Sequence, residues 1–239
     1  MQLARTDRLL IVADFDGTLA GIVPDPSKVP VNLAACEVLD RLAQLPDTTV
    51  AVLSGRGLED LKSVCPLRAP VTLAGSHGAE GEHGVELTGD MRARLDLVGA
   101  RLGALGIEGA YVEEKPFQRV FHVAPLADAD PAAAEAALAA ARAVDPAGTT
   151  VAGGKNIVEF SAARVTKGDW IAAKRAQVGA TATVFIGDDV TDENGFAALG
   201  PGDLGVKVGP GETLATRRVE FGAGVTDFLQ ELFTARAAR

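Results

Sequence analysis

The chain has little cysteine and little histidine, with two Cys and three His among its 239 residues. Two thiols exclude a disulfide framework and fit a reducing compartment, so we expect a cytoplasmic protein. Five Cys and His side chains in total also argue against a zinc cluster.

Long apolar runs are missing as well. No stretch approaches the ~20 residues that a membrane-spanning helix needs. The first apolar run, Leu9–Ala13, is too short for the core of a signal peptide, and Asp14 ends it. We therefore expect no membrane association and no secretion.

Positive charge is in deficit, because 23 Lys and Arg stand against 32 Asp and Glu, a net charge of −9. This balance argues against nucleic acid or an anionic membrane as the main partner. An acidic protein that acts on a phosphorylated substrate needs a local positive site or a metal. With 47% hydrophobic and 23% charged residues, the chain has the composition of a folded domain.

Short apolar runs alternate with helical patterns in both halves of the chain. Strands are predicted at Leu9–Ala13, 49–53, 71–74, 183–186 and 204–208, and helices at 32–45, 57–64, 169–178 and over the closing apolar stripe 225–233. This alternation is typical of βαβ units and predicts an α/β fold with a Rossmann-like parallel-sheet core.

The middle of the chain has a different pattern. A helix is predicted at 88–105, a hairpin at 111–115 and 119–123, an Ala-rich helix at Pro131–Arg142 capped by Asp130, and strands at 149–152 and 156–160. The α-β-β-α-β-β order predicts an antiparallel α+β cap domain at 82–163. It would be inserted into a core domain made of residues 1–81 and 164–239.

Two acids follow the first predicted strand, in Asp14-Phe15-Asp16-Gly17-Thr18. Open parallel sheets bind ligands at the carboxyl ends of their strands, and alternation puts Asp14 and Asp16 on one side of an extended segment. Two close carboxylates attract a cation such as Mg²⁺, and a carboxylate can also act as a nucleophile. A plain turn accounts for Gly17 but not for two acids after a buried strand.

A second acidic cluster, Gly187-Asp188-Asp189-Val190-Thr191-Asp192-Glu193, ends another predicted strand. If the two strands are neighbours, Asp188 joins Asp14 and Asp16 around one Mg²⁺. The alternative is a helix N-cap at Thr191 or Asp192, and both can hold together.

Two further segments are weaker alone. In Ser54-Gly55-Arg56, the Ser hydroxyl and the backbone N–H groups can bind phosphate oxygens, although a turn is the simpler interpretation. Lys167 precedes a predicted helix and can neutralise a phosphate, or it can be a solvated surface lysine.

In order and spacing, these four segments resemble the motifs of the haloacid dehalogenase superfamily of phosphotransferases. With Leu19-Ala20, Gly75-Ser76-His77-Gly78-Ala79-Glu80 and Val206-Lys207-Val208-Gly209 added, nearly the whole chain resembles the trehalose-6-phosphate phosphatase family. The resemblance implies a Mg²⁺-dependent phosphatase of trehalose biosynthesis that hydrolyses a phosphosugar through an aspartyl-phosphate.

The resemblance also implies residue roles. Asp14 is the nucleophile, Asp16 the general acid and base, and Ser54 and Lys167 hold the phosphoryl oxygens. The metal ligands are the Asp14 carboxylate, the Asp16 backbone carbonyl and Asp188, with Asp189 and Asp192 behind them orienting water and Lys167. The sugar contacts lie at His77, Glu80, His122, Lys155 and Glu159.

Each sugar contact has a structural alternative: a packed turn residue for His77, a core histidine for His122, and a solvated charge pair for Lys155 and Glu159. Ser161 and Ala124 stand where the family often has arginines. These departures keep other substrates open, namely sucrose phosphate, mannosyl-3-phosphoglycerate, or a phosphomutase reaction. A non-enzymatic phosphosugar sensor is disfavoured, because a sensor needs no nucleophile. A synthase partner cannot be read from the sequence.

Overall fold

The computed structural model describes residues 3–23, 25–154 and 156–239. The chain divides into two compact units: residues 1–84 with 165–239, called the larger unit, and residues 85–164, called the smaller unit. Among the described residues, no helix is both long and apolar enough to cross a membrane.

The smaller unit begins three residues later than the boundary at residue 82 expected from the sequence. Glu82 stays with the larger unit because helix α6 (Lys167–Val178) binds it. The indole Nε1 of Trp170 donates to the Glu82 carbonyl at 2.8 Å, and Lys174 Nζ donates to the Glu82 carboxylate at 2.6 Å.

The larger unit is built on a six-stranded parallel sheet with the order β10-β9-β8-β1-β2-β3. Its strands are β1 (Leu9–Ala13), β2 (Thr48–Leu53), β3 (Thr72–Ala74), β8 (Ala182–Gly187), β9 (Leu204–Val208) and β10 (Arg217–Val219). All residues of β1 and β8 are buried, which explains why these strands are continuous apolar runs. The edge strand β10 was not predicted, because only three residues form it and two of them are arginines.

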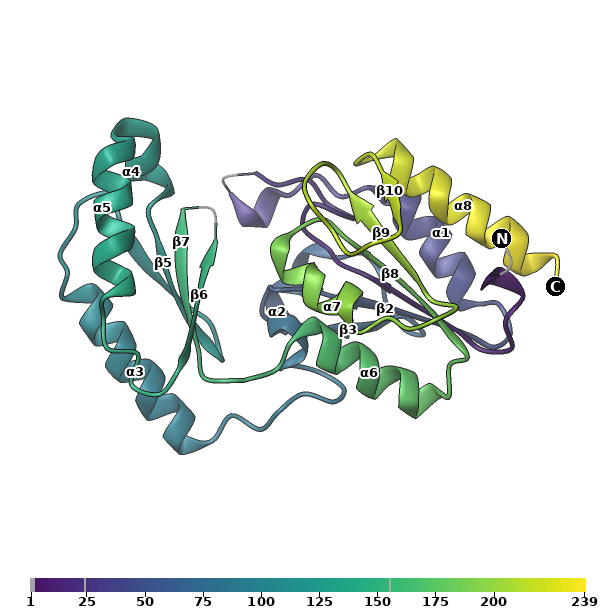
Figure 1. Ribbon diagram of the computed structural model, residues 1–239, viewed down its shortest axis with the longest axis horizontal. Helices are drawn as coiled ribbons and strands as arrows, with labels where there is room; N and C mark the ends of the chain where they lie inside the picture. The colour runs from purple at the N-terminus through teal and green to yellow at the C-terminus, as the bar shows by residue number, and fades with distance from the viewer. Residues whose placement is uncertain (1–2, 24, 155) are drawn as a thin grey trace. The chain divides into compact units, whose positions relative to one another are not determined.

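Helices cover both faces of this sheet. The larger unit contains α1 (Leu33–Ala43), α2 (Leu58–Val64), α6, α7 (Glu193–Ala197) and α8 (Ala223–Ala237), with short 3₁₀ turns at Leu3–Arg5, Pro26–Lys28, Ser76–Gly78 and Val190–Asp192. The side chains of Leu9 and Ile11 pack in one core cluster with α1 and α8, whereas Leu10 and Val12 pack in another with α6 and α7. Figure 1 shows these two layers on opposite sides of the sheet.

The register of the sheet brings several strand ends to one edge. Ala13 at the end of β1 is paired with Val52 of β2 on one side and with Ile186 of β8 on the other. The residues that follow these three strands therefore emerge side by side, which is the arrangement expected from the sequence.

The smaller unit is a four-stranded antiparallel sheet, in the order β4-β5-β7-β6, with helices on one face (Figure 1). Its elements are α3 (Gly89–Gly103), β4 (Tyr111–Glu114), β5 (Gln118–His122), α4 (Ala124–Ala129), α5 (Pro131–Arg142), β6 (Thr150–Gly154) and β7 (Ile157–Ser161). Its core is separate and includes Val98 of α3, Phe121 of β5 and Phe160 of β7.

The α/β fold class with an inserted α+β unit is confirmed, and one element order needs correction. The smaller unit reads α-β-β-α-α-β-β, because α4 precedes the Ala-rich helix. Asp130 ends α4 and caps α5 by accepting the N–H groups of Ala132 and Ala133. The glycines 153 and 154 belong to strand β6, so the turn to β7 follows them.

Candidate active site

Asp14 and Lys167 form a buried ion pair at the carboxyl edge of the parallel sheet. Asp14 directly follows β1, and its N–H donates to the Ile186 carbonyl of β8 at 2.8 Å. Lys167 is the first residue of α6, and its Nζ lies 2.5 Å from Asp14 Oδ1 and 2.6 Å from Asp192 Oδ1. Lys167 is only 3% exposed, so it is not a solvated surface lysine.

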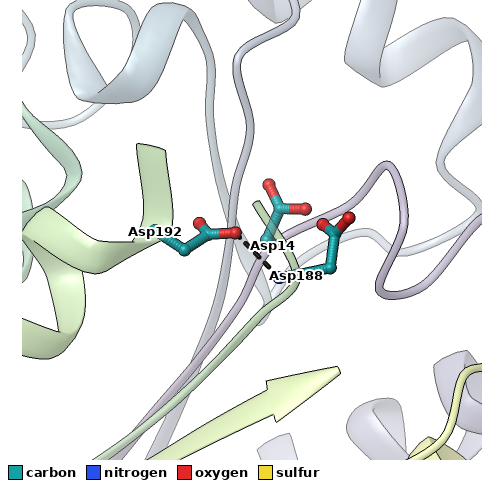
Figure 2. A group of neighbouring side chains, drawn as sticks. All are labelled: Asp14, Asp188 and Asp192. Atoms are coloured by element: carbon teal, nitrogen blue, oxygen red, sulfur yellow. Dashed lines mark hydrogen bonds between the residues drawn. The ribbon is translucent and has the colours of Figure 1, made fainter. Parts of the chain in front are cut away.

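Asp188 and Asp192 complete an acidic cluster with Asp14. Single carboxylate oxygens of the three residues lie within 4.8 Å of one another. Asp192 is fully buried, and its Oδ2 accepts the N–H groups of Asp188 and Asp189 at 2.8 and 3.0 Å. Figure 2 shows the carboxylates of Asp14 and Asp188 pointing the same way, while that of Asp192 turns toward the Asp188 backbone.

The electrostatics of the cluster favour a bound cation. Burial, with further contributions from Asp192 and Asp188, raises the pKa of Asp14 well above its ordinary value, although Lys167 opposes this shift. Burial and the neighbouring acids Asp192 and Asp189 raise the pKa of Asp188 to about 6. Asp188 Oδ1 is buried and has no hydrogen-bond partner among the described residues. A divalent cation with oxygen ligands fits such a donor set, because it would relieve both the repulsion and the unpaired oxygen.

Gly17 makes room for the Asp188 side chain. Its backbone has φ +83°, and a Cβ built on it would lie 2.0 Å from Asp188 Oδ2. Any side chain at this position would displace the Asp188 carboxylate. A glycine is therefore required at position 17 both by its positive φ and by the space that the Asp188 side chain takes.

Asp16 does not join the cluster with its side chain, because Arg56 holds it. Arg56 follows β2, is 7% exposed, and donates from Nε and Nη2 to the two Asp16 oxygens at 2.7 Å each. A third donor, Nη1, binds Asp60 of α2 at 2.8 Å. No function was predicted for Arg56, and its place in the tripeptide Ser54-Gly55-Arg56 was the one signal in the sequence that pointed to it.

Ser54 follows β2, and the 76–80 loop follows the neighbouring parallel strand β3. Ser54 is buried, and its hydroxyl oxygen accepts the Arg56 N–H at 3.1 Å. Ser76 and His77 both have positive φ, at 48° and 56°. This conformation brings the His77 ring against Gly55, where an added Cβ would lie 2.7 Å from His77 Cε1. Glu80 accepts the Ser76 hydroxyl at 2.6 Å.

Asp189 caps a turn, and no contact with Lys167 is found for it among the described residues. It is exposed, and its Oδ1 accepts the N–H of Val190 at 2.7 Å, so it caps the 190–192 turn. Both Asp189 and Asp192 were expected to orient water and Lys167. Of the two, Asp192 contacts Lys167. Asp192 is the N-cap residue of α7, as the N-cap alternative expected, but its side chain makes no capping hydrogen bond there; the side-chain cap of this segment is made by Asp189.

The remaining predicted sugar contacts belong to the smaller unit. His122 Nε2 lies 2.8 Å from Glu113 Oε2, and its ring stacks on Tyr111 with centroids 4.7 Å apart. Glu159 Oε1 accepts a hydrogen bond from Gln118 Nε2 at 2.9 Å. Lys155 lies outside the described residues.

Comparison with known proteins agrees with the chemistry of this site. Residues 12–88 match the model of the trehalose-phosphatase family. Over 93% of its length, the chain is 33% identical to the trehalose-6-phosphate phosphatase of Escherichia coli (strain K12) and covers 85% of that protein. The chain belongs to the trehalose-phosphatase family.

Other members of this family extend the comparison. The chain is 33% identical to a bifunctional trehalose-6-phosphate synthase/phosphatase from Thermoproteus tenax, matching over 96% of its own length but only 32% of that longer protein. A crystal structure described as a trehalose-6-phosphate phosphatase related protein superposes with a TM-score of 0.71 at 26% identity, covering 96% of this chain and 99% of that one. The likeness to this family therefore spans both units.

Proposed function

We propose that this chain is a Mg²⁺-dependent phosphatase that hydrolyses trehalose 6-phosphate to trehalose and phosphate through an aspartyl-phosphate intermediate. The observation that carries the proposal is the buried Asp14 carboxylate, paired with Lys167 at 2.5 Å and adjacent to Asp188, in a member of the trehalose-phosphatase family. A sensor of phosphosugars would have no use for a buried, cation-activated carboxylate.

The first chemical step belongs to Asp14 and Asp16. A carboxylate oxygen of Asp14 attacks phosphorus, and the bond between phosphorus and the sugar oxygen breaks. Asp16 gives a proton to the departing sugar oxygen, which leaves as a hydroxyl. Lys167 and the Ser54 hydroxyl hold the phosphoryl oxygens and offset their negative charge during the transfer.

The second step releases phosphate. Asp16, now ionised, takes a proton from a water molecule that attacks the phosphorus of the aspartyl-phosphate. The acyl-phosphate bond breaks and Asp14 returns as a carboxylate. The Arg56 fork binds both Asp16 oxygens and so fixes the direction of this carboxylate for both proton transfers.

Asp14, Asp188 and the Asp16 backbone carbonyl would hold the Mg²⁺. When bound, this cation supplies positive charge to the phosphoryl oxygens and to the carboxylates. Asp192 remains behind the ligands, because its two oxygens are already engaged with Lys167 and with the backbone N–H groups of residues 188 and 189.

We assign recognition of the sugar to the smaller unit, through His122, Glu159 and Lys155, and to His77 and Glu80 of the larger unit. Another phosphosugar, such as sucrose phosphate, is the alternative substrate. Fusion to a synthase in the Thermoproteus relative supports a synthase as a functional partner. The two cysteines, Cys36 and Cys65, are buried free thiols, which fits a reducing cytoplasm.

Phosphate release from a panel of phosphosugars tests this function directly. We expect the highest kcat/KM on trehalose 6-phosphate, complete loss of turnover in EDTA, and recovery with added Mg²⁺. Asp14→Asn should abolish turnover because an amide is a poor nucleophile, and Asp16→Asn should lower kcat by ~10²–10⁴-fold. Asp40→Asn, an exposed acid on α1, is the matched control.

Two results would contradict the proposal. Full activity in metal-free buffer would remove the cation from the chemistry. Near wild-type turnover by Asp14→Asn would require a different nucleophile. A different best substrate in the panel would instead keep the chemistry and change the substrate.

A further inference from the structure

Val120 lies on the helix-free face of the smaller unit's sheet, surrounded by polar side chains. It is 1% exposed, although α3 and α5 pack on the opposite face. The strand register places Glu113 of β4 and Glu159 of β7 directly across from it. Gln118 and His122 flank it along β5, so four polar residues, called the polar ring, are its neighbours on this face.

Two residues of this polar ring, Glu113 and His122, contact each other. His122 Nε2 contacts Glu113 Oε2 at 2.8 Å, and Lys115 Nζ lies 3.7 Å from the same oxygen. The Tyr111 ring lies parallel to the His122 ring, within 3°. These contacts fix Glu113 and His122 without help from a ligand.

The other two residues of this polar ring, Gln118 and Glu159, also contact each other. The Gln118 side chain is 2% exposed, and its Nε2 donates to Glu159 Oε1 at 2.9 Å. Among the described residues, it is the one side chain that hydrogen-bonds Glu159. Ser161 pairs with Gln118 across the strands, but its hydroxyl donates to the Ala163 carbonyl.

A glutamine at this position carries a cost in stability. Its Oε1 is buried and has no hydrogen-bond partner in the part of the chain that the structure describes. A buried polar atom without a partner costs on the order of 1–3 kcal/mol, which an apolar side chain of similar size would avoid. The bond to Glu159 is the gain that offsets this cost.

We propose that Gln118 is a positioning residue for sugar recognition, and that it holds the Glu159 carboxylate in place to accept hydroxyl groups of the sugar. The inference rests on the proposed function, since it concerns the preference for a phosphosugar over simple phosphate esters. A fixed, ionised carboxylate is a strong acceptor for sugar hydroxyls, whereas a freely rotating one loses conformational entropy on binding.

Kinetics on two substrates test the proposal. The measured quantity is the ratio of kcat/KM for trehalose 6-phosphate to kcat/KM for p-nitrophenyl phosphate. In Gln118→Met this ratio should fall about tenfold, mainly because KM for the sugar substrate rises. A tenfold fall corresponds to ~1.4 kcal/mol. Gln118→Leu is measured alongside, so that one misfolded variant does not decide the outcome. Ser161→Ala, which removes a neighbouring hydrogen bond that does not involve Glu159, should leave the ratio within twofold.

A double-mutant cycle separates positioning from independent effects. Glu159→Gln should lower the same ratio, and Gln118→Met should lower it no further in that background, because the two residues act as one unit. If the fold-loss of the double mutant equals the product of the two single fold-losses, the proposal is overturned. Equal losses on both substrates with a lowered Tm would assign Gln118 a structural role instead.

The pH dependence of kcat/KM distinguishes positioning from a purely structural role, because a purely structural role would leave it unchanged. Burial raises the pKa of Glu159 above its ordinary value; Lys115 opposes this shift, Glu113 adds to it, and the Gln118 hydrogen bond lowers the pKa. In Gln118→Met, the low-pH loss of kcat/KM on the sugar substrate should therefore move to higher pH, and an unchanged profile would contradict the proposal.

The same panel separates this proposal from the proposed function. If wild type prefers another phosphosugar, the proposed substrate is wrong and the ratio is measured with that ester. If wild type shows no preference for any phosphosugar over p-nitrophenyl phosphate, both are wrong.

Discussion

At the scale of single residues, the pairing of Arg56 with Asp16 is the contact that matters most for the proposed proton transfers. The two residues follow adjacent strands, β2 and β1, and the planar guanidinium meets both carboxylate oxygens. Such a fork fixes the direction of the carboxylate, which a lysine cannot do.

Arg56→Lys should therefore lower kcat strongly although the charge is kept. A misplacement of about 1 Å at a reacting group can cost on the order of 10²-fold, so we expect a loss of about ten- to hundredfold on p-nitrophenyl phosphate. Steady-state kinetics at saturating Mg²⁺ measure it. Asp60→Asn, which removes the other partner of Arg56, should change kcat by less than about threefold.

Comparable losses in Arg56→Lys and Asp60→Asn would place the effect in the packing of α2 rather than in Asp16. An unaltered kcat in Arg56→Lys would mean that the fork has no part in positioning Asp16.

Prediction from sequence worked for residues that mark strand ends and failed for partners distant in sequence. Asp14 and Asp188 were placed at one sheet edge because parallel strands share their carboxyl ends. The partner of Arg56 lies 40 residues away, and no local pattern specifies it. Asp189 looked equivalent to Asp192 in the motif, but only the fold decides which of two nearby acids turns inward.

At the scale of elements, the α4–α5 junction shows how one residue serves two helices. Asp130 ends α4, and its carboxylate caps α5, with Pro131 in the first turn. The Ala-rich helix was predicted with its correct bounds because cap, proline and alanine agree. Helix α4 was missed because it is six residues long and buries none of them.

Asp130→Ala should destabilise the protein by about 1 kcal/mol, since the first-turn N–H groups of α5 lose their acceptor. This corresponds to a fall in Tm of about 2–4 °C for a chain of this size. Differential scanning calorimetry measures it. The control is Asp128→Ala in the exposed last turn of α4, which should change Tm by less than 1 °C, about the size of an ordinary surface substitution.

A fall in Tm that is the same for both variants would show that the loss of an acid, not the loss of the cap, is responsible.

Asp188, which follows β8, should make the free energy of unfolding depend on pH when no metal is bound. The pKa of Asp188 in the folded protein, about 6, lies above the ~3.9 of an unfolded aspartate, so its ionisation opposes folding. Its contribution to stability is fully present below pH ~4 and is lost as the pH rises through 6.

In EDTA at pH 7.5, Asp188→Asn should therefore be more stable than wild type, by about 2–4 °C in Tm for an effect of ~1 kcal/mol. The difference should shrink toward zero at pH 4.5. Added Mg²⁺ should raise the Tm of wild type and not that of the variant, because only wild type keeps this ligand. A wild type that is more stable than the variant in EDTA at pH 7.5 would contradict the account.

At the scale of the whole molecule, the chain contains separate hydrophobic cores for its two units. One set of clusters surrounds the six-stranded sheet, and another lies between the four-stranded sheet and the helices α3 and α5. The change from continuous apolar runs to a hairpin pattern made this division predictable from sequence. The boundary at Glu82 was not predictable to the residue, because it depends on hydrogen bonds to Trp170 and Lys174.

Because its core is its own, the smaller unit should fold when residues 85–164 are expressed alone. Its 80 residues make it only marginally stable, so we expect a cooperative thermal transition below that of the full chain. Far-UV circular dichroism during heating measures this transition. The full chain should show the Mg²⁺-dependent rise in Tm, whereas the isolated fragment should show none because every acid of the Asp14 cluster lies outside it. A fragment that lacks a cooperative transition would mean that the smaller unit depends on the larger one for its fold, and that the chain unfolds as one cooperative body.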